Sequence, residues 1–511
     1  MPNPCARDHP SSSSRNHNTD RRGQRDAYRP RRPVHAPGSL RKLSHGAVKL
    51  ACSALVLALA TPLRADAIDD YVNAELQRQR IPGLALAIIR DGELQRAQGY
   101  GFANLEHRVP VHADTVFQAA SVGKQFTATA VMLMVEDGKL RLDETLRTYL
   151  PESPASWAPI TTRHLLTHTS GLDSSPSIDL RKDYTDDELL AVIYGARQLF
   201  PPGKGWSYSN TAYALLGLLV KKVGGESYIE VLRKRVFAPL NMTTADLIND
   251  RAIVPNRAAG YEIVDGKVMN QRWVAPTANS TADGSLSLTV LDFARWEAGI
   301  RAGKILEAQS WKQVSQPVTL SSGRTYPYGF GWSLETEGGR QVWRHSGAWQ
   351  GFTAFFIRYP DDGVAVVVMT NSSGGNPGTI ARHVAGLFEP TLAPQRAGPI
   401  EDRAPEPARR ANGLLDQLAT GRVDASQFDW QSGRPLEEVA TQDQKLVQPL
   451  GRRLAVQLFA RHERGDDTVY RYRARYETGL RELRLVLGPD DRIRGYRLTE
   501  ISAWDEPLTP D

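Results

Sequence analysis

Cysteine is nearly absent from this chain. Its 511 residues include only Cys5 and Cys52, and both lie in an N-terminal region that we expect to be removed. The mature protein therefore has no cysteine for a disulfide bond or a thiol nucleophile, even in an oxidising compartment. This scarcity excludes cysteine-based catalysis and a disulfide-stapled fold.

Long hydrophobic runs are also missing. The best candidate is an apolar segment of ten residues at 51–60, which is too short to span a bilayer. Basic residues stand before it at positions 41, 42 and 49, and Ala65-Asp66-Ala67 follows it as a small-x-small cleavage site. This order predicts a signal peptide at residues 41–67, cleaved after Ala67. We therefore expect a periplasmic or secreted protein without a stable membrane span.

The chain beyond the leader carries little net charge. The formal net charge is +6, but residues 1–67 hold twelve Lys or Arg and four Asp or Glu, which leaves about −2 for the rest. No nucleic-acid surface is predicted there. Residues 1–40 are rich in Ser, Asn, Arg, His and Pro, so they are expected to be disordered or an over-extended translation start. With 41% hydrophobic and 23% charged residues, the chain is globular in class and too long for one ordinary domain.

Ser121 and Lys124 form a Ser-x-x-Lys tetrad at the head of an apolar, helix-patterned run at residues 126–135. Residues three apart on a helix share a face, so the hydroxyl and the amine are expected within hydrogen-bond reach. A serine is a weak nucleophile until a base takes its proton, and a lysine is such a base only when its pKa is lowered. The tetrad favours covalent catalysis. The alternative is an N-capping serine beside a solvated lysine.

Two further motifs follow in order. Tyr208-Ser209-Asn210 opens a helical pattern that ends at residues 224–225. His345-Ser346-Gly347 lies between a weak strand pattern at 341–344 and a strong one at 352–359. Ser-x-x-Lys, then Tyr-x-Asn, then Lys-or-His-x-Gly is the pattern of serine beta-lactamases and penicillin-binding proteins.

On these motifs the sequence resembles the beta-lactamase-related serine hydrolases of the penicillin-binding superfamily. This family includes class C beta-lactamases, D-alanyl-D-alanine carboxypeptidases, D-aminopeptidases and esterases. Accessory stretches at residues 165–172, 211–217 and 282–296 share the resemblance. In the last stretch, Asp283 stands where the family usually has glycine. The resemblance covers about residues 68–390 and implies a serine hydrolase domain.

The resemblance implies a role for each motif residue. Ser121 would attack the carbonyl and become an acyl-enzyme, while Lys124 and Tyr208 would share proton transfer; which of the two is the base stays open. The backbone N–H groups of Ser121 and Ala348 are implied as the oxyanion hole. The implied substrate-binding residues are Asn210, His345, Ser346 and Gly347. This chemistry needs no metal or other cofactor, and it implies a small peptide, amide or ester substrate, with peptidoglycan as a further partner.

His345 departs from the commonest form of the third motif, which has lysine. A histidine is only partly cationic at neutral pH, whereas a permanent cation favours a substrate carboxylate. The histidine form resembles certain D-alanyl carboxypeptidases, D-aminopeptidases and esterase-like members. We therefore predict hydrolysis of a D-amino-acid peptide, of carboxypeptidase or aminopeptidase type. The alternatives are an esterase of the same family and a catalytically idle protein that binds the cell wall or a partner.

The predicted fold class is α/β (α+β): an antiparallel sheet flanked by helices with an all-helical subdomain, as in serine beta-lactamases and penicillin-binding proteins. Hairpins are expected at residues 84–99, with a type I′ turn at Asp91-Gly92, and at residues 352–370. The Pro- and Ala-rich stretch 391–410 predicts a linker. Strand-like alternation beyond it predicts a small α+β accessory domain at residues 411–511.

Two histidines and four tryptophans have more than one interpretation. His164 and His168 have the spacing of two metal ligands on a helix, but neither the Glu of a His-Glu-x-x-His site nor a third ligand accompanies them. A structural role is therefore predicted for both. The tryptophans near the second and third motifs are expected to line a hydrophobic substrate pocket or to pack in the core: Trp206, Trp332, Trp343 and Trp349.

Overall fold

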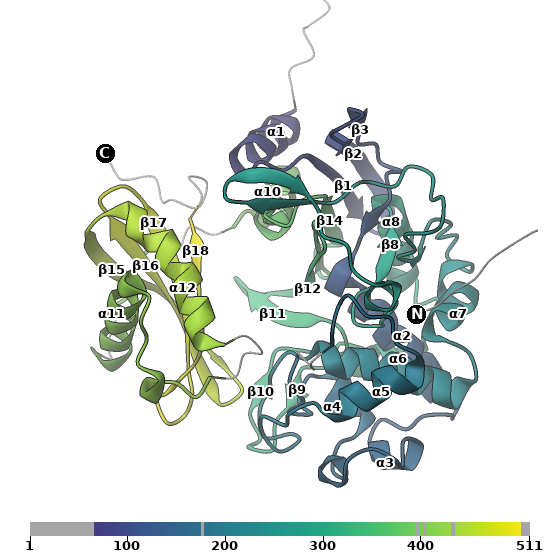
Figure 1. Ribbon diagram of the computed structural model, residues 1–511. Helices are drawn as coiled ribbons and strands as arrows, with labels where there is room; N and C mark the ends of the chain where they lie inside the picture. Colours follow the sequence, from purple (N-terminus) through teal and green to yellow (C-terminus); the bar gives the residue numbers. More distant parts are fainter. Residues whose placement is uncertain (1–65, 175–177, 395–397, 402–404, 431–434, 502–511) are drawn as a thin grey trace, which may run out of the picture. The chain divides into compact units, whose positions relative to one another are not determined.

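A computed structural model describes residues 66–174, 178–394, 398–401, 405–430 and 435–501 of the protein (Figure 1). Residues 1–40 and almost all of the predicted signal peptide lie outside the described residues. The first helix, α1 (Ala67–Gln79), begins at the predicted cleavage site, where the Asp66 carboxylate accepts a hydrogen bond from the Ile68 N–H at 3.0 Å. No helix in the described ranges is long and apolar enough to cross a membrane.

One antiparallel sheet joins the two ends of the first folded part. Its order is β11-β12-β13-β14-β1-β2-β3. The strands are β1 (Gly83–Arg90), β2 (Glu93–Asn104), β3 (Val109–Pro110), β11 (Ser333–Glu337), β12 (Arg340–Trp349), β13 (Phe352–Tyr359) and β14 (Val364–Thr370). Strand β1 pairs with β14, which brings the hairpin of β1 and β2 beside the hairpin of β13 and β14. The expected antiparallel sheet is confirmed.

Both expected hairpins are present. Asp91 and Gly92, between β1 and β2, have φ angles of 53° and 83°, the left-handed pair that a type I′ turn requires. Strands β13 and β14 have the bounds that their apolar runs predict. Strand β2 extends beyond the expected end at Gly99 to Asn104, where it pairs with β3.

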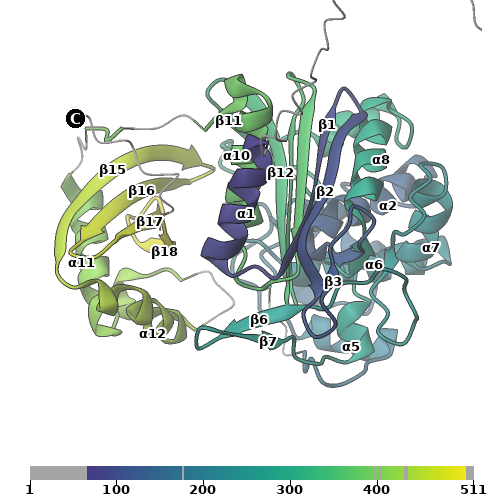
Figure 2. The ribbon, with the colours of Figure 1, turned by 90° about the horizontal axis from the view of Figure 1, so that it is seen from above.

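Helices cover both faces of this sheet (Figure 2). α1 and α10 (Pro377–Phe388) lie on one face, and α2 (Lys124–Glu136) and α8 (Val290–Arg301) lie on the other. Successive residues of β1 alternate between the two hydrophobic cores that result: Leu84, Leu86 and Ile88 in one, and Ala85, Ala87 and Ile89 in the other. A strand buried on both faces needs an apolar residue at every position, and the sequence of β1 supplies it.

The expected all-helical subdomain lies between β4 (Phe117–Gln118) and β8 (Leu286–Leu288) in the sequence. Its helices are α3 (Leu146–Tyr149), α4 (Thr162–Leu166), α5 (Asp186–Tyr194), α6 (Asn210–Gly224) and α7 (Tyr228–Leu232). Helix α6 packs against α2 and shares its hydrophobic core. The smaller elements are β5 (Asp246–Leu247), β6 (Tyr261–Val264), β7 (Lys267–Asn270), α9 (Ala308–Val314), β9 (Val318–Thr319) and β10 (Thr325–Tyr326).

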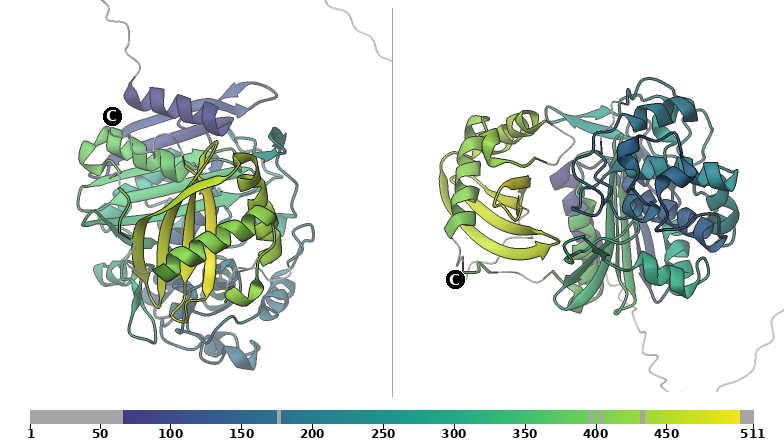
Figure 3. Two further views of the ribbon diagram at one scale, coloured as in Figure 1. Left: turned by 90° about the vertical axis from the view of Figure 1, so that its left-hand side faces the viewer. Right: turned by 90° about the horizontal axis from the view of Figure 1, so that it is seen from below.

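A second, smaller α+β part follows at the C-terminal end. Its four antiparallel strands are β15 (Arg453–Arg464), β16 (Asp467–Tyr476), β17 (Leu480–Leu487) and β18 (Ile493–Glu500). Helices α11 (Pro405–Thr420) and α12 (Leu436–Val447) cover one face of this sheet and share a separate core with it (Figure 3). α11 begins within the stretch predicted as a linker, and α12 was not predicted.

A buried ion pair links α8 to β13. The Arg358 guanidinium donates to the Glu297 carboxylate, with one contact at 3.0 Å, and both side chains are only 5% exposed. Removing one partner leaves the other charge buried without compensation. We therefore expect Arg358→Met to lower the free energy of unfolding by about 3–5 kcal/mol.

Urea denaturation followed by circular dichroism checks this value. Glu297→Leu combined with Arg358→Met should recover most of the loss, because no buried charge is then left alone. Lys234→Met, which breaks the exposed pair of Lys234 with Glu226, is the matched control and should change stability by less than about 0.5 kcal/mol. Equal losses in the single and double variants would contradict this account.

Candidate active site

Ser121 lies in a single 3₁₀ turn, Ala120–Gly123, that leads directly into α2, so the helix begins at Lys124 and not at Ser121. Ala120 has a φ of 48°, in the left-handed region that non-glycine residues seldom adopt. A Cβ atom on Gly347 would lie 2.3 Å from the Ala119 carbonyl oxygen and 3.0 Å from the Ser121 nitrogen. This strained turn, closely packed against β12, holds the half-buried Ser121 beside the sheet.

Lys124 is fully buried, and its amine donates hydrogen bonds to three oxygen atoms. Its Nζ donates to Ser121 Oγ at 3.1 Å, to Asn210 Oδ1 at 2.7 Å and to the backbone carbonyl of Asp283. Burial lowers the pKa of Lys124 to about 8, and the negative charge of Asp283 opposes this shift. The amine is therefore placed to exchange a proton with Ser121, and a substantial fraction of it is neutral near physiological pH.

Tyr208 lies over the same amine, with Lys124 Nζ 4.9 Å from the centre of its ring. Burial raises the pKa of Tyr208 well above its ordinary value, and the charge of Asp283 acts in the same direction, while a hydrogen bond with Ser121 opposes both. The phenol is thus protonated at neutral pH. The three predicted catalytic residues therefore lie together.

Asn210 is the first residue of α6, and the Ser209 hydroxyl caps this helix by accepting from the Ala212 N–H at 3.1 Å. The cap fixes the point where the chain turns from Tyr208 into the helix. Because Asn210 Oδ1 accepts from Lys124, the amide of Asn210 ties α6 to α2 beside the nucleophile.

The third motif lies within strand β12, and not between two strands as expected. Its residues alternate in burial: His345 and Gly347 are buried, whereas Ser346 and Ala348 are exposed. Strand β11 pairs with β12 only from Arg340 to Arg344. In the described part of the chain, residues 345–349 therefore pair with β13 on one side and present an edge without a strand partner on the other. Such an edge accepts an extended peptide backbone.

Both ring nitrogens of His345 have partners. Nδ1 lies 2.7 Å from the Ser346 carbonyl oxygen, and Nε2 lies 3.1 Å from the hydroxyl of Tyr328. Burial and the positive charge of Lys124 together lower the pKa of His345 to about 3, and the hydrogen bond with the Ser346 backbone opposes them. The ring is neutral at physiological pH, so the third motif of this protein brings no positive charge to the site.

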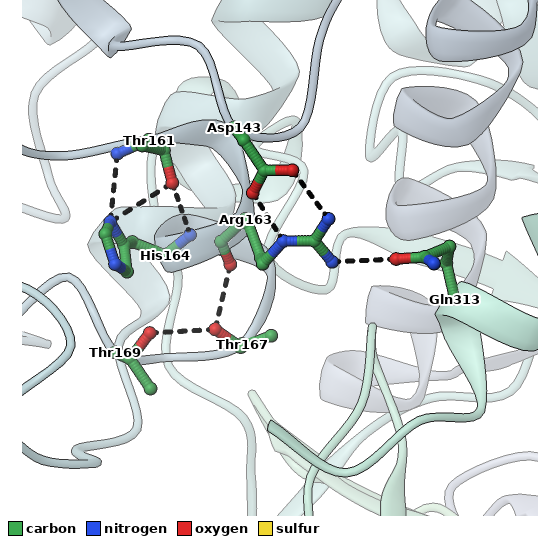
Figure 4. Close-up of polar contacts among 7 residues, drawn as sticks. All are labelled: Asp143, Thr161, Arg163, His164, Thr167, Thr169 and Gln313. Atoms are coloured by element: carbon green, nitrogen blue, oxygen red, sulfur yellow. Dashed lines mark hydrogen bonds and ion pairs between the residues drawn. The ribbon is translucent and has the colours of Figure 1, made fainter. Parts of the chain in front are cut away.

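His164 and His168 take structural contacts. His164 Nδ1 accepts from the Thr161 N–H at 3.1 Å, which completes a capping box at the start of α4 (Figure 4). Arg163 beside it holds Asp143 through contacts of 2.7 and 2.9 Å and reaches Gln313 at 2.8 Å. His168 is buried farther along the chain, and its Nδ1 accepts from the Ser209 N–H at 3.1 Å.

The four tryptophans divide into two groups. Trp332 is 1% exposed and packs against the half-buried Trp343 in the core. Trp206 stacks on Tyr326 at 4.1 Å and lies beside Tyr208. Trp349, at the end of the free edge of β12, donates from Nε1 to Asn279 Oδ1 at 2.8 Å. Trp206 and Trp349 are thus the two that flank the site.

Sequence reasoning did not find Tyr328 or the backbone carbonyl of Asp283. Tyr328 belongs to no motif, and it reaches His345 only because the fold brings the segment between β10 and β11 against β12. The Asp283 carbonyl is invisible in a sequence, since every residue has one. The sequence offered one signal for this position: Asp283 stands where the family usually has glycine.

Comparison with known proteins agrees with this geometry. Residues 68–387 match the Beta-lactamase family. Penicillin-binding protein 4* of Bacillus subtilis (strain 168) is 27% identical over 417 residues, covering 76% of this chain and 88% of that protein. A D-aminopeptidase of Brucella anthropi is 30% identical over 324 residues, 60% of each chain, so the chain spans about three fifths of that relative.

Solved structures show the same fold. The crystal structure of D-amino acid amidase from Ochrobactrum anthropi SV3 complexed with D-phenylalanine superposes with a TM-score of 0.55 and 26% identity, covering 63% of this chain and 97% of the amidase. The octameric penicillin-binding protein homologue from Pyrococcus abyssi superposes with a TM-score of 0.57 and 23% identity, covering 86% and 96%. With the family match over residues 68–387 and this fold, the chain belongs to the Beta-lactamase family and is a serine hydrolase of the penicillin-binding superfamily.

Proposed function

We propose that this protein is an exported serine hydrolase that forms an acyl-enzyme on Ser121 and cleaves the amide bond of a D-amino-acid peptide or amide. The observation that carries the proposal is the contact of 3.1 Å between Ser121 Oγ and a buried lysine whose pKa is about 8. A base with a pKa near the working pH is what activation of a serine hydroxyl requires.

The two proton-transfer roles follow from the opposite pKa shifts. Neutral Lys124 takes the proton of Ser121 as its Oγ attacks the substrate carbonyl carbon, and the N–H groups of Ser121 and Ala348 stabilise the oxyanion. Tyr208, which stays protonated, gives its proton to the leaving nitrogen as the C–N bond breaks, and Lys124 returns a proton to Tyr208. Water then attacks the acyl carbon and gives a proton to Lys124. Lys124 passes this proton to Ser121 Oγ as the C–Oγ bond breaks, which releases the acid and restores free Ser121 with a neutral lysine.

Substrate binding is assigned to the free edge of β12 and to Asn210. His345, Ser346 and Gly347 would hold the substrate backbone along this edge, and His345 would contribute by its position because it carries no charge. Two relatives named D-aminopeptidase and D-amino acid amidase support a D-amino-acid substrate.

The remaining parts of the proposal concern location and domains. Export to the periplasm or the medium rests on the signal peptide predicted at residues 41–67, with cleavage after Ala67. The hydrolase domain would span residues 68–390, followed by the linker 391–410 and the accessory domain 411–511. N-terminal sequencing of the protein from a culture should begin at Ile68.

A substrate comparison tests the proposed activity. The purified enzyme is given D-phenylalanine amide, L-phenylalanine amide, an N-acetylated peptide ending in D-alanyl-D-alanine and p-nitrophenyl acetate. We expect Ser121-dependent hydrolysis of the D-amide or the D-peptide, with Ser322→Ala, at an exposed serine, as the active control. Turnover of the ester alone would favour the esterase. No turnover of any substrate would favour a binding protein.

The pH dependence of kcat/KM follows from the pKa of Lys124. Since the lysine must be neutral to accept a proton, kcat/KM should rise with pH through about 8 and then level off. The negative charge of Asp283 favours the protonated lysine, so Asp283→Asn should lower this pKa and move the rise to lower pH.

Steady-state kinetics between pH 5.5 and 10 measure this shift, with Asp187→Asn on the exposed surface of α5 as the control. The control profile should match the wild type. A rise that stays in place in Asp283→Asn would show that a group other than Lys124 is titrating.

A further inference from the structure

Three buried side chains beside the site take no part in the proposed proton transfers. His168, Tyr328 and His345 are 0%, 4% and 6% exposed, and they come from segments far apart in the sequence. The Tyr328 hydroxyl lies between the two rings, 3.2 Å from His168 Nε2 and 3.1 Å from His345 Nε2. They form one continuous chain of hydrogen bonds, which we name the His-Tyr-His chain.

The hydrogen bonds at the two ends of the His-Tyr-His chain fix where its protons lie. Ser209 N–H donates to His168 Nδ1, so this nitrogen is unprotonated and His168 carries its proton on Nε2. The Ser346 carbonyl can only accept, so His345 carries a proton on Nδ1. His168 then donates to the Tyr328 oxygen, and Tyr328 donates its single proton to His345 Nε2. Every donor has an acceptor, and both rings are neutral.

The surroundings of the His-Tyr-His chain favour the neutral forms of both histidines. Burial and the positive charge of Lys124 lower the pKa of both histidines. The other titratable groups that face the chain are the phenols of Tyr208, Tyr213 and Tyr326, and burial raises the pKa of each of them above its ordinary value. No carboxylate is among these facing groups in the described residues.

The His-Tyr-His chain also joins the Tyr208 motif to the His345 motif, which lie on different parts of the fold. At one end it holds the backbone N–H of Ser209, which lies between Tyr208 and Asn210 at the start of α6. At the other end it holds His345 and the Ser346 carbonyl on β12. The spacing between the proton donor Tyr208 and the substrate-binding edge of β12 therefore depends on Tyr328.

We propose that Tyr328 and His168 are positioning residues that hold the Tyr208 motif against β12 and fix His345 as the neutral tautomer protonated on Nδ1. The catalytic consequence rests on the proposed function. A neutral His345 in the third motif does not attract a substrate carboxylate. The site therefore selects amino-acid amides, and peptides in which no free carboxylate lies next to the bond that is cleaved.

The tautomers are measured first, because this readout needs no activity. In ¹⁵N-histidine NMR spectra of the full mature chain, assigned with His168→Gln and His345→Gln, both rings should stay neutral from pH 5.5 to 8.5. His345 should show a protonated Nδ1 and a bare Nε2, and His168 the reverse. A cationic ring, or His345 protonated on Nε2, would overturn the proposal.

Tyr328→Phe then tests the positioning role, because it removes the hydroxyl and keeps the ring against Trp206 and His168. We expect kcat to fall by about 10- to 100-fold with a change in KM below about 3-fold. The His345 signals should show both tautomers. The control is Tyr326→Phe, at a buried tyrosine outside the His-Tyr-His chain. This variant should keep the kcat and the His345 tautomer of the wild type.

The remaining outcomes decide between the two proposals. An unchanged kcat and a single His345 tautomer in Tyr328→Phe would overturn the positioning role, whatever the substrate. The amide form of one substrate should be cleaved at least about 10-fold faster than the form with a free carboxylate next to the cleaved bond. An enzyme without turnover but with the expected tautomers would contradict the proposed function and leave the His-Tyr-His chain intact.

Discussion

Ser121→Ala is expected to abolish turnover of every amide and ester substrate, with a loss in kcat of about 10⁴-fold or more. Among the residues that the structure describes, no other hydroxyl has the same arrangement: Ser121 Oγ lies 3.1 Å from Lys124 Nζ, at a turn packed against β12. Without this oxygen no covalent intermediate forms, and only binding and the oxyanion hole remain. The measurement is initial rates with the substrate that the wild type cleaves best.

The loss must come from chemistry and not from unfolding. Ser121 is half-buried, and removing its hydroxyl leaves no cavity of consequence, so the melting temperature should stay within a few degrees of the wild type. The control variant Ser322→Ala should keep full activity. A Ser121→Ala enzyme that retains a tenth of the wild-type rate would rule out Ser121 as the nucleophile.

Lys124 variants are expected to have the second-largest effect. Lys124→Arg keeps a positive charge but no longer has a neutral form, because a guanidinium does not lose its proton in a protein. Lys124→Met keeps the length of the side chain and removes both the charge and the base. Both should lower kcat by about 10²- to 10⁴-fold, the usual contribution of a general base.

The two substitutions separate charge from proton transfer. If Lys124 acted only through its charge on Asn210 and Ser121, Lys124→Arg would keep most of the activity while Lys124→Met would lose it. Lys139→Arg, at an exposed lysine just after α2, is the control and should behave as the wild type. High activity in Lys124→Arg would therefore contradict the role of Lys124 as the base.

Local sequence patterns predicted several strands, because the apolar runs and turn residues that define these strands lie within short segments of the sequence. The apolar run at residues 352–359, the turn, and the run at 364–370 matched β13 and β14 at both ends. Helix α12 was missed because its polar residues outnumber its buried ones, Leu436, Ala440 and Val447. Its helical form depends on packing against α11 and the C-terminal sheet, which no local pattern reports.

The motifs predicted residues that the fold brings together in the candidate site, but they did not predict the residues that hold them in place. Ser121 and Lys124 are three residues apart, so the local 3₁₀ turn that leads into α2 brings them together. Tyr328 meets His168 across 160 positions, and this contact depends on the whole fold. The charge of His345 also required the structure, since a histidine in a sequence is compatible with both protonation states, whereas burial next to Lys124 favours one.

Intact-mass spectrometry of the mature protein is the most direct test of the central claim, the formation of a covalent intermediate on Ser121. The wild type and Ser121→Ala are each incubated with a fluorophosphonate, a penicillin and a p-nitrophenyl acyl ester. We predict one fluorophosphonate adduct per wild-type chain and none on Ser121→Ala, with a lasting penicilloyl mass if the enzyme is of the peptidase type. A folded wild type that takes up none of the three reagents, or an adduct that persists in Ser121→Ala, would contradict the account.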